Sequence, residues 1–297
     1  MSEVDRWQPV ARQTISVEEA LAVAALRDRC NASDGLDLKI SIPTQASSEP
    51  EATRWPQAFL IHSENALAGY CSLDGDQRTV EVCGMVAPEL RRRRMGHALL
   101  EAAREACKMG GVSEILLICE EASTAGGAFV TKEGGTRQFA EHRMELRDFA
   151  AMRRGLDREP QLSLRTAGKE DIGTLAYTRA AIFAAEEDID AIEKDIEQEL
   201  PSTSTHFYLA ELEGTPVSSL KVYVLEGRAS IYAFGVMPQQ RRHGFAWATL
   251  ALLVEQLRAQ GITRIGLEVE TTNMPAVSLY RACGFVSTTT YGYYSLP

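Results

Sequence analysis

Hydrophobic residues follow a helical period in the segment after Pro238. Four of them fall at offsets of 0, 4, 7 and 11 residues and share one helical face: Ala246, Leu250, Leu253 and Leu257. Gly261 predicts the end of this helix, and the run Ile262–Glu270 predicts a strand after it. The pattern therefore predicts a helix that packs by one apolar face and leads into a strand.

The same pattern occurs in the first half of the chain. The counterpart of the helix after Pro238 has Gly96, Leu100, Ala103 and Cys107 on one apolar face. This helix is expected to end at Gly110–Gly111 and to lead into a strand over Glu114–Glu120. Subtracting 150 carries eight residues of the second half onto identical residues of the first: Val236, Pro238, Arg241, Ala248, Leu250, Gly261, Glu270 and Gly284 onto Val86, Pro88, Arg91, Ala98, Leu100, Gly111, Glu120 and Gly134. We interpret the chain as a tandem duplication.

Two domains follow from the repeat. The segment Asp148–Gln161 loses strand alternation and ends in Pro160 before a strand-like run at Leu162–Leu164. We expect domains at residues 1–150 and 162–297, joined by a linker at 151–161. In the second domain, a helical start is predicted over Lys169–Ala184, with strands near Phe207–Glu211, Val217–Leu225 and Ala229–Val236.

An acidic stretch between these elements has two interpretations. Its acidic residues are Glu186, Glu187, Asp188, Asp190, Glu193, Asp195, Glu197 and Glu199. Ile189, Ile192, Ile196 and Leu200 recur through it at helical spacing. A helix with one buried stripe and a solvated acidic face explains the pattern. The alternative is an acidic lid that attracts a positively charged acceptor.

Composition excludes several classes of function. A net charge of −10 argues against broad nucleic-acid binding, which needs a basic surface, and is compatible with an amine substrate. No apolar run approaches the roughly 20 residues that span a bilayer, and the first residues lack the features of a signal peptide. We expect a cytoplasmic protein with no membrane partner. The six cysteines show no CxxC pair, so we expect buried reduced thiols and no metal site.

The segment Arg241–Ala246 joins a strand to a helix start. Unpaired backbone N–H groups and the helix dipole favour an anion there. Gly244 lets the backbone approach a ligand closely, and Arg241 and Arg242 add charge that suits a diphosphate. His243, Phe245 and Ala246 complete this segment.

A second signature lies one helix and one strand later, at Asn273-Met-Pro-Ala-Val-Ser-Leu-Tyr280-Arg-Ala-Cys-Gly284-Phe285. Together the two signatures resemble the GNAT N-acetyltransferase superfamily, strongly in the second half and weakly in the first. The resemblance implies two tandem α/β (α+β) domains, each a mixed, mostly antiparallel sheet flanked by helices. It also implies that acetyl-CoA is the cosubstrate.

The resemblance assigns roles to the residues of the second half. Phe234, Gly235 and Val236 would line the pantetheine arm, and the amides of Arg241 through Ala246 would hold the pyrophosphate. Asn273 would hold the pantetheine or a bridging water. Tyr280 would be the general acid that protonates the departing thiolate, because a phenol with a reference pKa of about 10 remains protonated at neutral pH.

The general base is left open. Many family members have a glutamate on the strand before Val236, where this chain has Ser230, Ile231 and Tyr232. Glu268 and Glu270 share one face of the following strand and are candidates to act through water; surface carboxylates or ion-pair partners are the alternative. Tyr232 is a candidate for the acceptor pocket.

The first half has lost much of this set. Gly244 corresponds to Arg94, Asn273 to Ser123, Tyr280 to Val130 and Phe285 to Gly135. We expect the first half to have little transfer activity, and whether it still binds CoA stays open.

The predicted function is acetyl-CoA-dependent N-acetylation in the second domain, by direct transfer in a ternary complex. The acceptor is a small-molecule or peptide amine, and the chain is a monomer or a homodimer. The layout also resembles that of the mycothiol synthases, which is one alternative. The other is a non-catalytic acyl-CoA sensor or scaffold.

Overall fold

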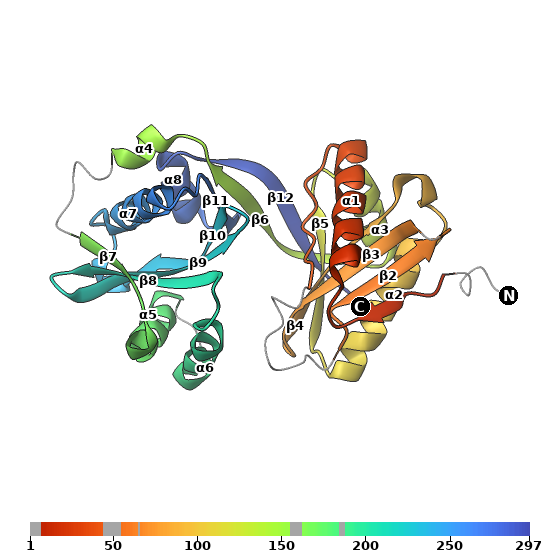
Figure 1. Ribbon diagram of the computed structural model, residues 1–297, viewed down its shortest axis with the longest axis horizontal. Coiled ribbons are helices and arrows are strands. Elements are labelled where there is room, and N and C mark those ends of the chain that lie inside the picture. Colours follow the sequence, from red (N-terminus) through yellow and green to blue (C-terminus); the bar gives the residue numbers. More distant parts are fainter. Residues whose placement is uncertain (1–6, 44–54, 65, 155–161, 184–187) are drawn as a thin grey trace. The chain divides into compact units, whose positions relative to one another are not determined.

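The structure, a computed structural model, describes residues 7–43, 55–64, 66–154, 162–183 and 188–297. The chain divides into two compact units, which Figure 1 colours along the sequence. Unit 1 comprises residues 1–140 and 289–297, and unit 2 comprises residues 141–288. Unit 1 is therefore built from both ends of the chain.

Unit 1 is a mixed sheet with helices on both faces. Its elements in chain order are β1 (Val10–Arg12), α1 (Val17–Asp34), β2 (Ala58–Ser63), β3 (Ala66–Gly75), β4 (Thr79–Val86), η3 (Pro88–Leu90), α2 (Met95–Gly110), β5 (Glu114–Glu120) and α3 (Thr124–Lys132). The strand order is β1-β2-β3-β4-β5-β12, with β4 and β5 parallel and the other pairs antiparallel. Helix α1 packs on one face and α2 on the other.

Unit 2 repeats this plan. Its elements are α4 (Phe149–Arg153), β7 (Leu162–Thr166), η5 (Lys169–Asp171), α5 (Ile172–Phe183), α6 (Ile189–Glu199), β8 (Thr205–Leu212), β9 (Thr215–Leu225), β10 (Arg228–Val236), η6 (Pro238–Gln240), α7 (Phe245–Ala259), β11 (Arg264–Glu270) and α8 (Met274–Ala282). The strand order is β7-β8-β9-β10-β11-β6, with β10 and β11 parallel. The prediction of mixed, mostly antiparallel strands flanked by helices is confirmed in both units.

The two units exchange their last strands. Strand β6 (Thr136–Leu146) starts in unit 1, and its residues Glu141–Glu145 pair with β11 of unit 2. Strand β12 (Phe285–Ser295) starts in unit 2, and its residues Tyr291–Ser295 pair with β5 of unit 1. Each half of the repeat thus supplies a strand to the other half's unit.

The compact units differ from the predicted domains 1–150 and 162–297 because hydrophobic periodicity does not reveal which strands pair. The predicted linker begins within α4, which buries Ala151 and Met152 and belongs to unit 2. Residues 155–161 of that linker lie outside the described residues. The division into two repeat domains along the chain stays a prediction.

The acidic stretch forms helix α6, as its periodicity predicts. Ile192 and Ile196 are 1% exposed, Ile189 is 41% exposed, and Asp188 is the N-cap. The buried stripe is formed by Ile192 and Ile196, whereas the prediction that Ile189 is buried is wrong, because it lies in the first turn at the exposed start of the helix. Glu186 and Glu187 lie outside the described residues. Within the part of the chain that the structure describes, no helix is long and apolar enough to cross a membrane.

Candidate active site

Strands β10 and β11 of unit 2 separate after four paired positions. Parallel pairing runs from Arg228 opposite Arg264 to Ile231 opposite Leu267. Beyond this point β10 continues alongside β9, and β11 continues alongside β6. The diverging edge of β10 contains Phe234, Gly235 and Val236, the residues predicted to line the pantetheine arm.

A β-bulge interrupts β10 at this point. The pairing with β9 shifts between Tyr232 and Gly235, and Ala233 has a positive φ of 45°. Bulges re-aim backbone groups and recur next to active sites, and a non-glycine residue at positive φ is a sign of local strain. The corresponding strand β4 of unit 1 pairs with β3 without any such shift.

The predicted phosphate turn has two left-handed residues before a helix start that no side chain caps. Arg242 and Gly244 adopt left-handed φ values of 68° and 83°. Gly244 is the N-cap of α7 and provides no side-chain hydrogen bond to the helix start. The first backbone N–H groups of a helix need partners, and an anion is a favourable one.

The side chains of the turn have different environments. The Arg241 guanidinium donates to the carbonyls of Val236 at 3.1 Å and Ile182 at 2.8 Å, so it fixes the turn to α5. His243 is exposed, with its ring 5.8 Å from that of Phe245. Phe245 is 5% exposed and packs in the core, while Ala246 lies at its edge. Both arginines are exposed, but the Arg241 guanidinium is held by these bonds, so the side chain of Arg242 is better placed to reach a ligand.

Gly235 is required by a close approach of α5. A Cβ at this position would lie 2.2 Å from Cγ2 of Ile182. Its carbonyl accepts a hydrogen bond from Ser218 Oγ at 2.7 Å. The glycine thus allows the helix to pack directly on the diverging strand.

Tyr280 lies in an aromatic cluster beside the same strand. Its ring centroid is 6.4 Å from that of Phe234 and 5.9 Å from that of Phe285. Tyr280 is 7% exposed, and burial raises its pKa to about 12. Burial also raises the pKa of the nearby Cys283 thiol to about 12. Both groups therefore carry their protons at neutral pH.

Asn273 is the N-cap of α8. Its side-chain oxygen accepts from the backbone N–H of Ala276 at 3.3 Å. Ser123 caps α3 of unit 1 in the same way, accepting from Gly126 at 3.0 Å. The exchange of Asn for Ser therefore preserves the capping role in both halves.

The two candidate carboxylates both have partners in unit 2. Glu268 pairs with Arg143 of β6 at 3.2 Å, and the Glu270 carboxylate accepts from the hydroxyl of Thr272. Alternation along β11 puts both on the face opposite the large core. Glu270 is exposed, whereas Glu268 is part-buried in its ion pair.

Tyr232 is 45% exposed, with the ammonium of Lys221 5.7 Å from its ring centroid. Lys221 pairs in turn with Glu199 of α6 at 2.7 Å. The sequence did not indicate that Lys221, Glu199 or Arg143 belongs near the predicted site residues. Their positions follow from strand pairing and from the packing of α6, which no local pattern encodes.

Unit 1 keeps the backbone geometry of the phosphate turn. Arg92 and Arg94 have φ values of 65° and 63°, which match Arg242 and Gly244 of unit 2. An arginine in the left-handed region costs on the order of 1 kcal/mol relative to glycine. Unit 1 therefore has the same turn conformation, although Arg94 replaces the glycine that would adopt it at lower cost.

A cavity of about 440 Å³ lies in unit 1. Its lining includes the turn, residues of both diverging strands β4 and β5, and side chains of α2 and α3. Parallel pairing of β4 with β5 ends at Val82 opposite Leu117, so these strands also diverge. A cavity of this size holds a small molecule.

Strand register also locates a glutamate that the ungapped repeat misaligns. Glu81 is opposite Leu116 in unit 1, and Ser230 is opposite Gly266 in unit 2. Leu116 and Gly266 correspond in the repeat, so Glu81 is the counterpart of Ser230. The extra residue of the β10 bulge causes the displacement. Unit 1 thus has a glutamate at the register position where unit 2 has Ser230.

One group of side chains in unit 1 has the composition of a metal site. Ligand atoms of His97, Glu101 and Glu133 lie within 4.8 Å of one another. Arg104 lies 2.9 Å from the Glu101 carboxylate and 3.9 Å from that of Glu133. The guanidinium already lies beside both carboxylates and offsets one of their two negative charges, which disfavours a cation at this position.

Comparisons with known proteins agree with the resemblance seen in the two signatures. The model of the acetyltransferase (GNAT) family matches residues 29–134 and 173–285. Both halves of the repeat therefore match, and the matched residues make up most of the chain.

Curated relatives cover nearly the whole chain at low identity. A mycothiol acetyltransferase of Streptomyces avermitilis is 27% identical over 293 residues, covering 92% of this chain and 90% of the relative. A mycothiol acetyltransferase of Streptomyces griseus is 24% identical over 237 residues, covering 77% of this chain and 76% of the relative.

Solved structures share the fold. A GCN5-related N-acetyltransferase from Sphaerobacter thermophilus has a TM-score of 0.76 at 19% identity, covering 99% of this chain and 97% of its own. A tandem GNAT protein from the clavulanic acid biosynthesis pathway has a TM-score of 0.70 at 17% identity, covering 97% of each chain.

Proposed function

Because the chain belongs to the acetyltransferase (GNAT) family, we propose that unit 2 transfers an acetyl group from acetyl-CoA to an amine. The chain is a tandem acyltransferase that resembles mycothiol synthase in layout. One observation carries the choice of unit 2: the bulge at Ala233 and the phenol of Tyr280 occur together there, whereas β4 has no register shift and Val130 replaces the tyrosine.

The residues of unit 2 fit acetyl-CoA. The uncapped start of α7, with Gly244 in the left-handed region, would hold phosphate oxygens through backbone N–H groups. The exposed Arg242 would add charge, and Arg241 would position the turn through its bonds to Val236 and Ile182. The diverging edge of β10 would pair with the amide-bearing arm of the cosubstrate. Bound acetyl-CoA supplies an activated acyl group.

The bulge supports a role in polarising the acyl carbonyl. At Ala233 the backbone leaves the ladder with β9, which directs a peptide group away from its usual partner. A preorganised N–H directed at a developing oxyanion contributes about 10²–10³ in rate. We assign this role to the peptide segment at Ala233 and Phe234.

Tyr280 is proposed as the acid that protonates the leaving thiolate. A pKa of about 12 keeps the phenol protonated. The phenol can therefore donate its proton to a thiolate as the C–S bond breaks. Burial also raises the pKa of Cys283 to about 12. Because Cys283 remains a protonated thiol, we propose direct transfer without a cysteinyl intermediate.

The acceptor is proposed to be a small-molecule or peptide amine that enters beside Tyr232. An amine must lose its proton before attack, and Ser230 stands where unit 1 has Glu81. Glu270, which is exposed, is the candidate to take this proton through water. Glu268 is proposed to position β11 through Arg143. The carboxylates of this face favour a cationic acceptor.

A narrower candidate is the acceptor of the mycothiol acetyltransferases. It is favoured by the alignment of those relatives over both halves of the chain. A second candidate property is binding of the same cosubstrate by unit 1. It is favoured by the cavity of unit 1, whose lining includes Arg92 and Arg94.

Release of thiol from acetyl-CoA, measured with a panel of amines, tests the proposal. We expect amine-dependent release by the full chain. Arg242→Glu should raise the KM for acetyl-CoA about tenfold through repulsion of the phosphates, whereas the matched change Arg92→Glu in unit 1 should leave it unchanged. Binding of CoA without thiol release for any amine would support a non-catalytic sensor instead.

A further inference from the structure

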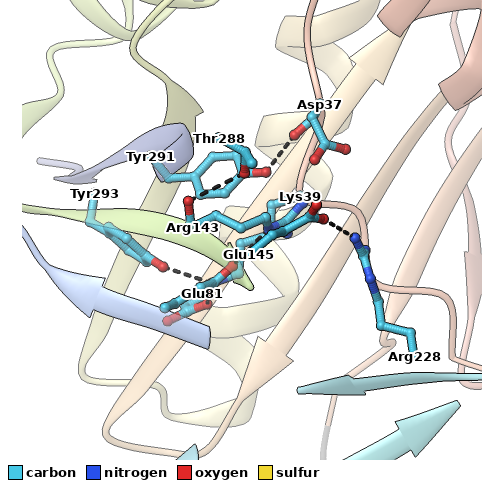
Figure 2. Close-up of polar contacts among 10 residues, drawn as sticks. Asp37, Lys39, Glu81, Arg143, Glu145, Arg228, Thr288, Tyr291 and Tyr293 are labelled. Carbon is cyan, nitrogen blue, oxygen red and sulfur yellow. Dashed lines mark hydrogen bonds and ion pairs between the residues drawn. The ribbon is translucent and has the colours of Figure 1, made fainter. Parts of the chain in front are cut away.

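A half-buried lysine lies in the cavity of unit 1. Lys39, in the segment between α1 and β2, lines the cavity together with Glu120 and Tyr291. Its ammonium donates to the Tyr293 hydroxyl at 2.7 Å and lies 3.9 Å from the carboxylate of Glu81. The rings of Tyr291 and Tyr293 lie 6.0 and 5.2 Å away (Figure 2). The lysine is thus surrounded by groups that recognise an amine.

Strand register places this cluster where β4 and β5 diverge. The last parallel pair is Val82 opposite Leu117, one residue beyond Glu81. Tyr293 is opposite Ile118, one residue beyond Leu117. The lining of the same cavity also contains the arginine turn that begins α2. A ligand whose phosphates bind that turn, and whose arm follows the diverging strands, would end beside Lys39.

The backbone around Lys39 is anchored on both sides. The N–H of Asp37 donates to the buried Glu120 carboxylate at 2.8 Å. The Tyr291 hydroxyl donates to the Asp37 carbonyl (Figure 2). Further along, the Tyr70 hydroxyl donates to the carbonyl of Ser41 at 2.7 Å. The lysine is therefore held in position before any ligand binds, which is the condition for a fast intramolecular reaction.

We infer that Lys39 is an internal acyl acceptor of unit 1, modified by an acyl-CoA bound in the same cavity. The inference takes its donor class from the proposed function and places a separate reaction in the other unit. Glu81 is its base, and Tyr291 and Tyr293, supplied by the exchanged strand β12, are positioning residues.

Acyl transfer to Lys39 conserves atoms and charge. The Glu81 carboxylate accepts one proton from the ammonium and passes it to solvent. The neutral nitrogen forms a C–N bond with the thioester carbonyl carbon, and the C–S bond breaks. The second proton of the nitrogen goes to the sulfur, which leaves as a thiol. The products are an N-acyl lysine, free CoA and one proton in solution.

A competing nucleophile in the cavity is Cys83. Its thiol is buried and its pKa is raised, first by burial, so it remains protonated and weakly nucleophilic. Lys39 is the better acceptor because it keeps part of its side chain in solvent and has a carboxylate beside it.

Mass spectrometry of the full chain, incubated with isotopically labelled acetyl-CoA, tests the inference. We expect label at Lys39, at least about tenfold faster than at the exposed Lys108 and Lys194, with a rate independent of protein concentration. Glu81→Gln should slow labelling by about 10²-fold, as expected for loss of a general base. Arg92→Glu with Arg94→Glu should abolish it and weaken CoA binding measured by calorimetry. Both arginines are exposed, so the fold should persist, as circular dichroism will check.

The control is Tyr280→Phe, which disables the proposed acid of unit 2 and should leave labelling of Lys39 unchanged. Labelling of Lys39 at the rate of the exposed lysines, or its loss in Tyr280→Phe, would overturn the inference. Amine-dependent thiol release without labelling of Lys39 would reject the inference alone. Labelling of Lys39 without thiol release to any amine would reject the proposed function alone.

Discussion

Replacing Gly235 by alanine tests whether α5 and the diverging strand β10 are packed at the limit of backbone approach. The added Cβ would lie 2.2 Å from Cγ2 of Ile182. Carbon atoms in good contact are about 3.5–4.0 Å apart, so the helix or the strand must shift by about 1.3–1.8 Å. Overpacking of this kind costs about 1–3 kcal/mol. The carbonyl of Ile182 accepts a hydrogen bond from Arg241, so a shift of α5 should also displace the phosphate turn and raise the KM for acetyl-CoA.

The sign of the effect should reverse when Ile182 is shortened. Ile182→Ala removes Cγ2 and with it the clash. Gly235→Ala on that background should be neutral, or stabilising by about 0.4–1 kcal/mol through the lower entropy of the unfolded chain, because Gly235 does not have a left-handed φ. Ile182→Val keeps Cγ2 and is the matched control, so the full penalty should remain with it.

Urea unfolding measures the four free energies of this cycle. The fluorescence of Trp247 in α7 reports on unit 2 when Trp7 and Trp55 are changed to Phe. A coupling free energy near zero between Gly235→Ala and Ile182→Ala would refute the packing derived from the structure. The same conclusion would follow if Gly235→Ala left the unfolding free energy unchanged.

Two further changes have defined outcomes. Arg165 donates to both carboxylate oxygens of Asp171 at 2.8 Å and lowers the pKa of Asp171 below 3.8. Because the arginine is part-exposed, Arg165→Leu should lower the free energy of unfolding by about 1–2 kcal/mol. Because folding lowers the pKa of Asp171, this stabilisation is present above pH 3.8 and is lost as the pH falls through the pKa of the folded state. The difference in unfolding free energy between the wild type and Arg165→Leu, measured with urea, should be constant at neutral pH and shrink in acid. Deleting residues after Thr288 removes the strand that pairs with β5 and the buried rings of Tyr291 and Tyr293; hydrogen exchange should show loss of protection in β5, and full protection there would contradict the strand exchange.

Local patterns in the sequence predicted much of the fold. The helix with Leu250, Leu253 and Leu257 on one face is α7, with these three residues 0% exposed. The repeat is confirmed in the backbone, where Arg92 and Arg242 share the same unusual φ. These features depend on neighbours a few residues apart, which periodicity and turn chemistry describe well.

Features that depend on pairing between distant segments of the chain could not be predicted from local sequence patterns. The bulge at Ala233 inserts one residue into β10, so an ungapped repeat aligned Glu81 with Ile231 instead of Ser230. The exchange of β6 and β12 places Tyr293 beside Lys39, 254 residues away in the chain. Asn273 has a capping role that explains its presence without a ligand, and its assignment to cosubstrate binding stays a prediction.

The kcat of Tyr280→Phe, measured by thiol release with the best amine of the panel, tests the central claim most directly. The ring and its contacts with Phe234 and Phe285 are preserved, so unfolding should be nearly unchanged while the proton donor is removed. We predict a loss of about 10²–10⁴ in kcat, and normal activity in the unit 1 counterpart Val130→Ala. An unchanged kcat in Tyr280→Phe would contradict the assignment of the acid and, with it, the choice of unit 2 as the site of transfer.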